Sequence, residues 1–313
     1  MAKKKPYRYF VYLLARLGAL ILMILPRRWS LAAARQAGRL GFILVSRQRE
    51  KILASLGKAF GGEKSPKEIE TIGRDVLGHL IQTAIDFLKF TRMNPAKAAA
   101  FIEIGDTDAF CKDILQEGNG LIIMTAHLGN WELLAGALCR LKGFRGAVVG
   151  RRIYYEPYNR WIIKLREAVG VQTIYSDESV RRIREHLRRN EIVGLLPDQD
   201  MENVHGIFVD FFGKPAYTPI APVKFAMATN TPVLPAFLVR IPGDRYRLIR
   251  GDLIRPKIEG DRDQSVRKYT EVWMRAFEAV IRQYPDQWAW MHDRWKTTPE
   301  MMGLKNEEAV NFS

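Results

Sequence analysis

The pattern of apolar and polar residues changes character near residue 100. Before this point apolar residues recur every three to four positions, as in amphipathic helices, most clearly from Lys67 to Phe90. Beyond it, apolar runs of four or five residues alternate with stretches of helical length. Such runs are typical of strands that are buried on both faces of a parallel sheet. The pattern therefore predicts an α/β fold, with a helical part at residues 31–100 packed against it.

Six short segments are the predicted strands of this sheet, and most of the intervening segments are predicted helices. We expect a central, mostly parallel or mixed sheet flanked by helices, formed by a single domain over residues 31–313. The predicted strands are Phe101 to Ile104, Leu121 to Met124, Gly146 to Gly150, Ile192 to Leu196, Pro232 to Arg240 and Tyr246 to Arg250.

Residues 1–30 have a different composition from the rest of the chain. An apolar segment from Tyr9 to Leu25, interrupted by Arg16, lies between a basic head and a Pro-Arg-Arg-Trp sequence. The basic head comprises Lys3, Lys4, Lys5 and Arg8. Flanking aromatic and basic residues are typical of membrane-interface anchors. We interpret residues 1–30 as an uncleaved membrane-associating segment, either spanning the bilayer or lying in its interface. The alternatives are a signal peptide and a core helix.

Composition and charge narrow the function classes. The 313-residue chain has a formal net charge of +15, which favours an anionic partner: nucleic acid, an anionic membrane, an acidic protein or a phosphorylated substrate. Cys111 and Cys139 stand alone and the five histidines form no ligand cluster, so neither a metal nor another cofactor is expected. The chain has no GxSxG, P-loop or GxGxxG motif, so covalent serine, P-loop and dinucleotide chemistry lose support.

The stretch GLIIMTAHLGNWELL, from Gly120 to Leu134, predicts a buried strand, a short loop and a helix. This geometry presents side chains at the carboxyl edge of an α/β sheet, where such folds keep their sites. His127 lies in the predicted loop, and Glu132 lies in the first helical turn. We expect the Glu132 carboxylate to fold back onto the imidazole, forming a general base for a substrate hydroxyl. The alternative is that His127 is a helix cap or a satisfied core group.

Two further sites contribute candidate residues. Asp198 and Asp200 follow the strand from Ile192 to Leu196, where acidic side chains are again placed for a site. An ordinary turn is the alternative. Arg166 lies near the end of a helix predicted from about Glu156, where a basic residue also complements the helix dipole.

At these residues the chain resembles a known family. HLGNWE, from His127 to Glu132, is similar to the H-x4-D/E motif of the lysophospholipid acyltransferase superfamily. The order of the surrounding segments resembles the late acyltransferases of lipid A biosynthesis, the lauroyl- and myristoyltransferase branch. These segments are GRRIYYEPYN (150–159), PDQD (197–200), GIFVDFFGKPAYT (206–218), APVKFAMATNTPVLPAF (221–237) and PDQWAWMHDRWK (285–296).

The resemblance implies transfer of a fatty acyl chain from acyl carrier protein to a hydroxyl of a phosphorylated glucosamine lipid, at the cytoplasmic face of the inner membrane. It implies catalytic roles for four residues: His127 as general base, Glu132 orienting it, Arg166 stabilising charge and Asp198 structuring the site. It implies substrate binding by Asn130, Arg151, Asn159 and Asp200. The segment Glu156-Pro157-Tyr158-Asn159 departs from the family pattern and bears on the choice of acceptor.

Other functions remain open at the level of sequence. The acceptor is alternatively another glycolipid or a lysophospholipid, or the same residue pair hydrolyses its substrate with water. A non-catalytic basic protein that binds membranes or nucleic acid is a further alternative. Nucleic acid is not an expected partner, because the chain has no recognisable nucleic-acid module and its basic residues alternate with acids.

Overall fold

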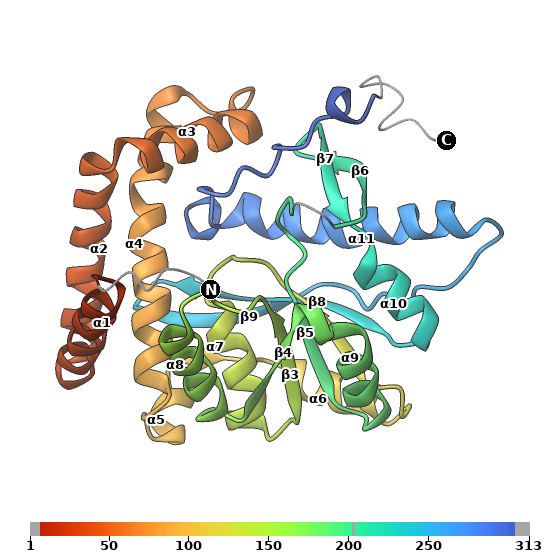
Figure 1. Ribbon diagram of the computed structural model, residues 1–313, viewed down its shortest axis with the longest axis horizontal. Coiled ribbons are helices and arrows are strands. Elements are labelled where there is room, and N and C mark those ends of the chain that lie inside the picture. The colour runs from red at the N-terminus through yellow and green to blue at the C-terminus, as the bar shows by residue number, and fades with distance from the viewer. Residues whose placement is uncertain (1–6, 202–203, 304–313) are drawn as a thin grey trace.

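The computed structural model describes residues 7–201 and 204–303, and it is built around a seven-stranded sheet with the strand order β1-β9-β8-β2-β5-β3-β4 (Figure 1). All neighbouring strands in it are parallel except β8 and β9, so the predicted mostly parallel sheet is confirmed. The strands are β1 (Ile102–Glu103), β2 (Leu121–Met124), β3 (Gly146–Gly150), β4 (Val171–Tyr175), β5 (Ile192–Leu195), β8 (Val233–Ile241) and β9 (Arg245–Arg250).

Helices cover both faces of the sheet. A smaller antiparallel hairpin of β6 (Gly206–Phe211) and β7 (Lys214–Pro219) packs against α11 (Figure 1). The helices are α1 (Tyr7–Ile24), α2 (Arg27–Leu44), α3 (Ser46–Phe60), α4 (Pro66–Phe90), α5 (Pro95–Ala99), α6 (Thr107–Leu115), α7 (Trp131–Gly136), α8 (Glu156–Glu167), α9 (Ser179–Arg188), α10 (Ala221–Thr229) and α11 (Arg262–Gln283). Shorter turns are η1 (Ala137–Leu141), η2 (Ser176–Glu178), η3 (Pro285–Gln287) and η4 (Glu300–Met302).

The central strand β2 shows how the apolar runs build the core. Its four residues are all buried, and their side chains alternate between the two faces of the sheet, as a period of two requires. Ile122 and Met124 join the apolar cluster that contains Phe277 of α11, whereas Leu121 and Ile123 belong to the cluster on the other face. A strand that faces two cores has no polar positions, which explains its continuous apolar run.

A buried ionic network ties the N-terminal helices to the sheet. The carboxylate of Asp86 in α4 is fully buried, and it accepts hydrogen bonds from Arg27 at 2.7 Å and Arg240 at 2.9 Å. The hydroxyl of Tyr246 in β9 donates to the same carboxylate at 2.8 Å. Because a buried carboxylate is stable only when its lone pairs are satisfied, these partners hold α2, α4 and β8 together.

The predicted N-terminal segment is only partly an independent unit in this structure. Its apolar part forms α1, whereas Arg27 already belongs to α2 and contacts Asp86. Of the predicted basic head, Lys3, Lys4 and Lys5 lie outside the described residues, whereas Arg8 belongs to α1. Among the described residues, α1 is the one helix that is long and apolar enough to cross a membrane.

The contact between α2 and α4 generates a prediction about stability. A Cβ atom on Gly38 would lie 2.2 Å from the backbone nitrogen of Gly78, and neither backbone can yield cheaply. We expect Gly38→Ala to lower the free energy of unfolding by about 3 kcal/mol or more. The measurement is urea unfolding of the detergent-solubilised protein.

Gly57 in α3 provides the matched control, because a Cβ atom there would meet no atom within 4 Å. Gly57→Ala is expected to raise the free energy of unfolding by about 0.5 to 1 kcal/mol, since alanine is the better helix former. Equal midpoints for the two variants would contradict the close packing of α2 on α4.

Candidate active site

The two chain segments that carry His127 and Asp198 leave neighbouring strands at the same level. Strands β2 and β5 pair in parallel, with Met124 opposite Leu195. His127 lies three residues beyond Met124, and Asp198 lies three residues beyond Leu195. The equal offsets place both side chains at the carboxyl edge of the sheet, as expected for an α/β site.

Asp198 is the carboxylate that holds the imidazole of His127. Its Oδ1 atom lies 2.8 Å from Nδ1 of His127, and its Oδ2 atom accepts from the backbone N–H of the same residue at 2.9 Å. The indole N–H of Trp288 donates to Oδ2 at 2.8 Å. Because an ionised carboxylate only accepts hydrogen bonds, Nδ1 of His127 carries the proton in this pair.

The expected hydrogen bond from Glu132 to His127 is therefore wrong. The Glu132 carboxylate instead forms a bidentate ion pair with the guanidinium of Arg166 in α8, with N···O distances of 2.5 and 2.9 Å. The reason is geometric: Glu132 lies in the first turn of α7, which faces α8, and a guanidinium offers two parallel donors. Arg166 also approaches the hydroxyl of Thr173 at 3.4 Å.

The electrostatic surroundings of His127 favour its charged form. Burial lowers the pKa of the imidazole, but the charge of Asp198, its hydrogen bond and the charge of Glu132 together raise that pKa above the ordinary value. For Asp198, burial raises the pKa, and the contacts with His127 and Trp288 outweigh it, so the pKa is lowered. The pair thus consists of an ionised carboxylate and a base of increased strength.

A cavity of about 790 Å³ opens beside this pair, and both His127 and the Glu132–Arg166 pair line it. Its walls are largely apolar and come from β3, α8, α9, α10 and the loop after β5. The apolar lining residues are Trp131, Val148, Val149, Ile153, Ile162, Ile163, Val180, Ile183, Leu195, Leu196, Met201, Val204 and Phe225. A mostly apolar cavity with a few converging polar groups is the usual form of a small-molecule site.

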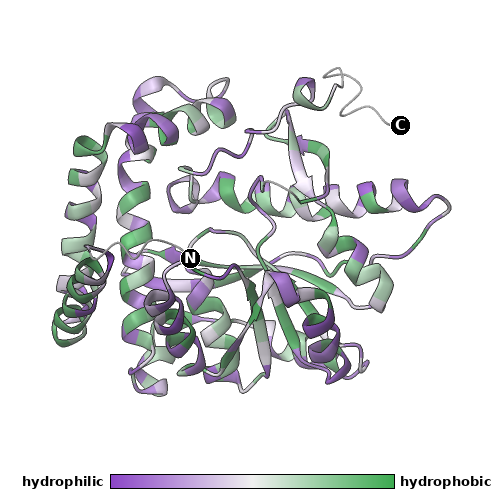
Figure 2. Ribbon diagram, in the orientation of Figure 1, coloured by the Kyte–Doolittle hydropathy of each residue, from purple (hydrophilic) through white to green (hydrophobic). Residues whose placement is uncertain are grey.

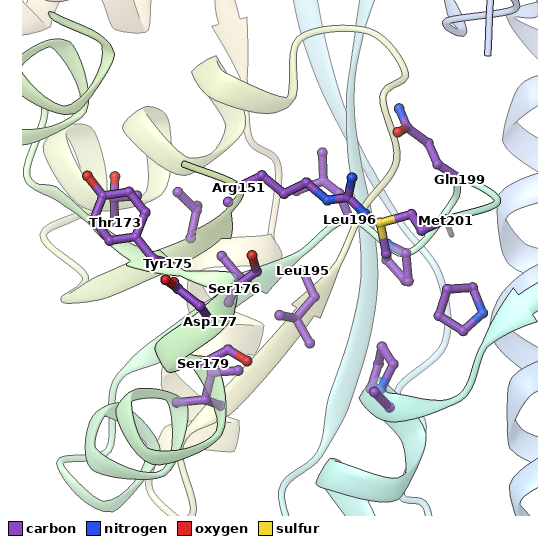
Figure 3. Close-up of a pocket in the computed structure, with 18 of the residues that line it drawn as sticks. Arg151, Thr173, Tyr175, Ser176, Asp177, Ser179, Leu195, Leu196, Gln199 and Met201 are labelled. Atoms are coloured by element: carbon purple, nitrogen blue, oxygen red, sulfur yellow. The ribbon is translucent and has the colours of Figure 1, made fainter. Parts of the chain in front are cut away.

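Of the four predicted substrate-binding residues, Arg151 and Asn159 line the cavity. The guanidinium of Arg151 extends across the cavity toward the segment that carries Leu196 and Met201 (Figure 3). The Asn159 amide is buried, and both of its polar atoms have hydrogen-bond partners within the protein. Its oxygen accepts from Ile153 N–H at 3.1 Å, and its nitrogen donates to a tyrosine hydroxyl. Asn159 therefore shapes the wall of the cavity.

The other two predicted substrate-binding residues do not line the cavity. Asn130 is fully buried, and its side chain caps α7 through Leu133 N–H and donates to Tyr246. Asp200 accepts hydrogen bonds from the backbone and hydroxyl of Thr297, at 2.7 and 3.0 Å. Both predictions are corrected, because these side chains hold the loop between β2 and α7 and the C-terminal segment in place.

Two site residues were missed by the sequence analysis. Trp288, in the tryptophan-rich tail, supports Asp198, and the Gln199 amide lies 3.0 Å from Nδ1 of His127. The tail gave no signal for this role, because only the tertiary fold brings residue 288 to residue 198. The pairing of His127 with Asp198 did have a signal, because both residues follow closely after predicted strands: His127 lies three residues beyond Met124, and Asp198 lies two residues beyond Leu196.

The fold and the site define a class: an open α/β protein with a histidine–aspartate pair at the sheet edge, facing an apolar cavity. Comparison with protein families gives a more specific assignment. Residues 1–297 match the family model described as bacterial lipid A biosynthesis acyltransferase. The chain belongs to this family, as its sequence resemblance predicted.

Curated relatives share limited identity with this chain. A phosphatidylinositol mannoside acyltransferase of Mycobacterium tuberculosis H37Rv is 30% identical over 125 residues, which is 39% of each chain. The lipid A biosynthesis lauroyltransferase of Escherichia coli K12 is 24% identical over 196 residues, which is 60% of each chain. A lipid A biosynthesis acyltransferase of Haemophilus influenzae is 26% identical over 187 residues, 56% of this chain and 53% of the relative. The aligned part thus spans between about two fifths and three fifths of these relatives.

The contact between Asp198 and His127 predicts a measurable titration. We expect Asp198→Asn to lower the pKa of His127, because the charge that raises it is removed while the burial that lowers it remains. Imidazole resonances followed by NMR across pH 5 to 9 report this pKa directly. Glu132→Gln serves as the comparison, with a smaller decrease because Glu132 acts on His127 only through its charge. A His127 pKa that is unchanged in Asp198→Asn would contradict the pairing.

Proposed function

We propose that this protein is a membrane-associated acyltransferase that moves a fatty acyl chain from acyl carrier protein to a hydroxyl of a lipid A precursor. The observation that carries this proposal is His127, which is held by Asp198 and lines a largely apolar cavity. Family membership supports the reaction class. The cavity supports an acyl chain as one reactant, since apolar walls bind an alkyl chain by removing it from water.

The proposed mechanism is direct attack with general-base assistance. Nδ1–H of His127 donates to Asp198, which leaves Nε2 as the nitrogen that accepts the proton of the acceptor hydroxyl. The hydroxyl oxygen attacks the thioester carbonyl carbon, forming the new C–O bond. As the tetrahedral intermediate collapses, the C–S bond breaks and the imidazolium returns its proton to the leaving thiolate. Asp198 stabilises the imidazolium between these steps without itself taking the proton.

The Glu132–Arg166 pair has a supporting role in this proposal. Burial lowers the pKa of Arg166 but the Glu132 carboxylate raises it, so the guanidinium stays charged at the cavity wall. A fixed positive group there stabilises negative charge that develops on the thioester oxygen or on a substrate phosphate. Glu132 holds that guanidinium in place and strengthens His127 as a base through its charge.

The charge of the chain agrees with both proposed partners. Acyl carrier protein is acidic and lipid A precursors carry phosphates, and the net charge of +15 attracts both. Exposed apolar side chains of α1 support association with a membrane. We place the protein at the cytoplasmic face of the inner membrane, with residues 1–30 as the membrane-associating segment and 31–313 as the acyltransferase domain.

A second acceptor class has a specific observation in its favour. Two relatives that are each 30% identical over 125 residues are phosphatidylinositol mannoside acyltransferases, so a different phosphorylated glycolipid is an alternative acceptor. Mass spectrometry of the lipid formed from a mixture of the two acceptors distinguishes them. The same experiment tests hydrolysis, in which free fatty acid forms in place of an acylated lipid.

The general base provides the first kinetic prediction. We expect His127→Gln to reduce acyl transfer by at least about 100-fold, because the acceptor hydroxyl then loses its proton acceptor. The measurement is turnover of radiolabelled acyl carrier protein thioester with a glycolipid acceptor, alongside circular dichroism to confirm folding. His79→Gln is the matched control, since His79 also pairs with a carboxylate, Asp286, but does not line the cavity. Full turnover in His127→Gln would refute the proposal.

The raised pKa of His127 gives a pH prediction. Only neutral His127 accepts a proton, so kcat/KM is expected to fall as the pH drops through a value above 6.5. In Asp198→Asn the pKa of His127 is lower, so the fall of kcat/KM on the acidic side of the profile moves to lower pH. The rate on the plateau falls by about 100-fold or more, because the imidazole loses its orientation. If kcat/KM fell at the same pH in both proteins, a group other than His127 would control its pH dependence.

A further inference from the structure

Helix α1 contacts the folded body through one of its sides. Its less exposed residues recur at intervals of four and three positions, which forms one stripe on an α-helix. This inner stripe comprises Arg8, Tyr12, Ala15, Ala19 and Leu22. In Figure 1 α1 lies beside α2 and α4, at the side of the molecule where α8 is also found.

Near its N-terminal end, α1 is attached to α8 by an aromatic cluster, which we define as Tyr12, Tyr155, Tyr158 and Trp161. The ring of Tyr12 lies 5.3 Å from that of Tyr158 and 6.4 Å from that of Trp161, in edge-to-face geometry. Arg16 extends the cluster, since its guanidinium lies 5.3 Å from the ring of Trp161. Aromatic pairs in this geometry stabilise a contact beyond the burial of their area.

Near its C-terminal end, α1 is attached to α4. The ammonium group of Lys89, which is buried, donates to the carbonyl oxygens of Leu22 and Leu25, both at 2.5 Å. These are carbonyls at the end of α1, which have no partner within the helix. The Leu22 side chain packs against the small apolar cluster that contains Leu31 and Ile85. Both ends of α1 are therefore fastened to the same folded body.

The outward face of α1 is apolar and uncovered (Figure 2). The exposed fraction of its large apolar residues reaches 85% at Ile24. The outward residues of α1 are Phe10, Leu13, Leu14, Leu17, Leu20, Ile21 and Ile24. Arg28 is exposed four residues after Ile24, so positive charge follows directly on this apolar face, the combination that suits an anionic lipid surface.

We propose that α1 lies in the plane of the membrane interface, with its outward face in the lipid and its inner stripe on the folded body. A spanning orientation conflicts with the two attachments. An 18-residue helix is about 27 Å long, so its ends would lie near opposite membrane surfaces. The body fastened to both ends would then have to enter the hydrocarbon, together with the exposed Arg160 and Lys164 of α8.

This orientation has a consequence for substrate entry, which rests on the proposed function. Helix α8 carries the aromatic cluster on one side, and its Ile162, Ile163 and Arg166 line the catalytic cavity on the other. An in-plane α1 therefore holds the α8 wall of the cavity at the level of the lipid head groups. A membrane-embedded acceptor reaches His127 from the bilayer surface without first dissolving in water.

Depth-dependent fluorescence quenching tests the orientation by itself. A fluorophore is attached to a single cysteine in each of three variants, Leu13→Cys, Leu17→Cys and Ile24→Cys. All three carry the background substitutions Cys111→Ser and Cys139→Ser. The labelled proteins are bound to vesicles with about 30% anionic lipid. Spin-labelled lipids with shallow and deep quenchers report each depth. We expect all three labels at one shallow depth. A label at position 17 near the bilayer centre would overturn the proposal in favour of a spanning helix. Labels that no lipid quencher reaches would overturn it in favour of a protein partner.

Paired substitutions test the consequence. Leu17→Gln/Leu20→Gln is expected to weaken vesicle binding by at least tenfold and to reduce turnover of a bilayer-embedded acceptor, while turnover of a short-chain, micelle-dispersed acceptor is unchanged. The matched control is Ile258→Gln/Met301→Gln, which alters two exposed apolar residues on other elements. Equal vesicle binding by the two double variants would refute the role of α1. Absence of acyl transfer in the wild type would refute the proposed function, while the depth measurement would still decide the orientation.

Discussion

The hydrogen bond between the imidazole of His127 and the carboxylate of Asp198 depends on strand pairing rather than on local sequence. Two parallel strands in register bring the third residue after each strand to one place, and each side chain leaves its strand through a short loop. A buried carboxylate with three donors is stable as an anion, and that anion in turn makes the histidine a stronger base. Both the geometry and the electrostatics of the site follow from this one register.

The loop between β2 and α7 is held just as tightly from its other side. Gly129 has φ near +61°, and a Cβ atom there would lie 2.2 Å from the carbonyl oxygen of Leu238, so only glycine fits. The next residue, Asn130, donates its N–H to that same carbonyl at 2.8 Å. Its side chain reaches Tyr246, which belongs to the Asp86 network. The backbone and side chain of Asn130 thus connect the loop after β2 to β8, to β9 and, through Asp86, to α4.

Ionic pairs at the site perform different tasks according to their burial. Asp198 is almost completely buried and tunes one imidazole. The Glu132–Arg166 pair is partly exposed on the cavity wall, where its guanidinium lines the cavity. Asp86 touches no substrate cavity among the described residues, and it joins helices to the sheet. Three acidic residues therefore have different partners, a histidine, one arginine on a cavity wall and a buried network between helices and sheet, as decided by what packs around each one.

The sequence by itself determined the fold class, the position of the central strand and the candidate histidine, because these depend on periodicity and on short-range order. Strand β4 was missed, since as an edge strand it is half exposed and lacks a continuous apolar run. Only the tertiary structure decided that Asp198, not Glu132, holds His127, that Trp288 supports Asp198, and that Asn130 and Asp200 are structural. The physical reason is that a hydrogen bond depends on the positions of two atoms to within a fraction of an ångström, and residues 70 to 160 positions apart acquire such positions only when the sheet and its covering helices have formed.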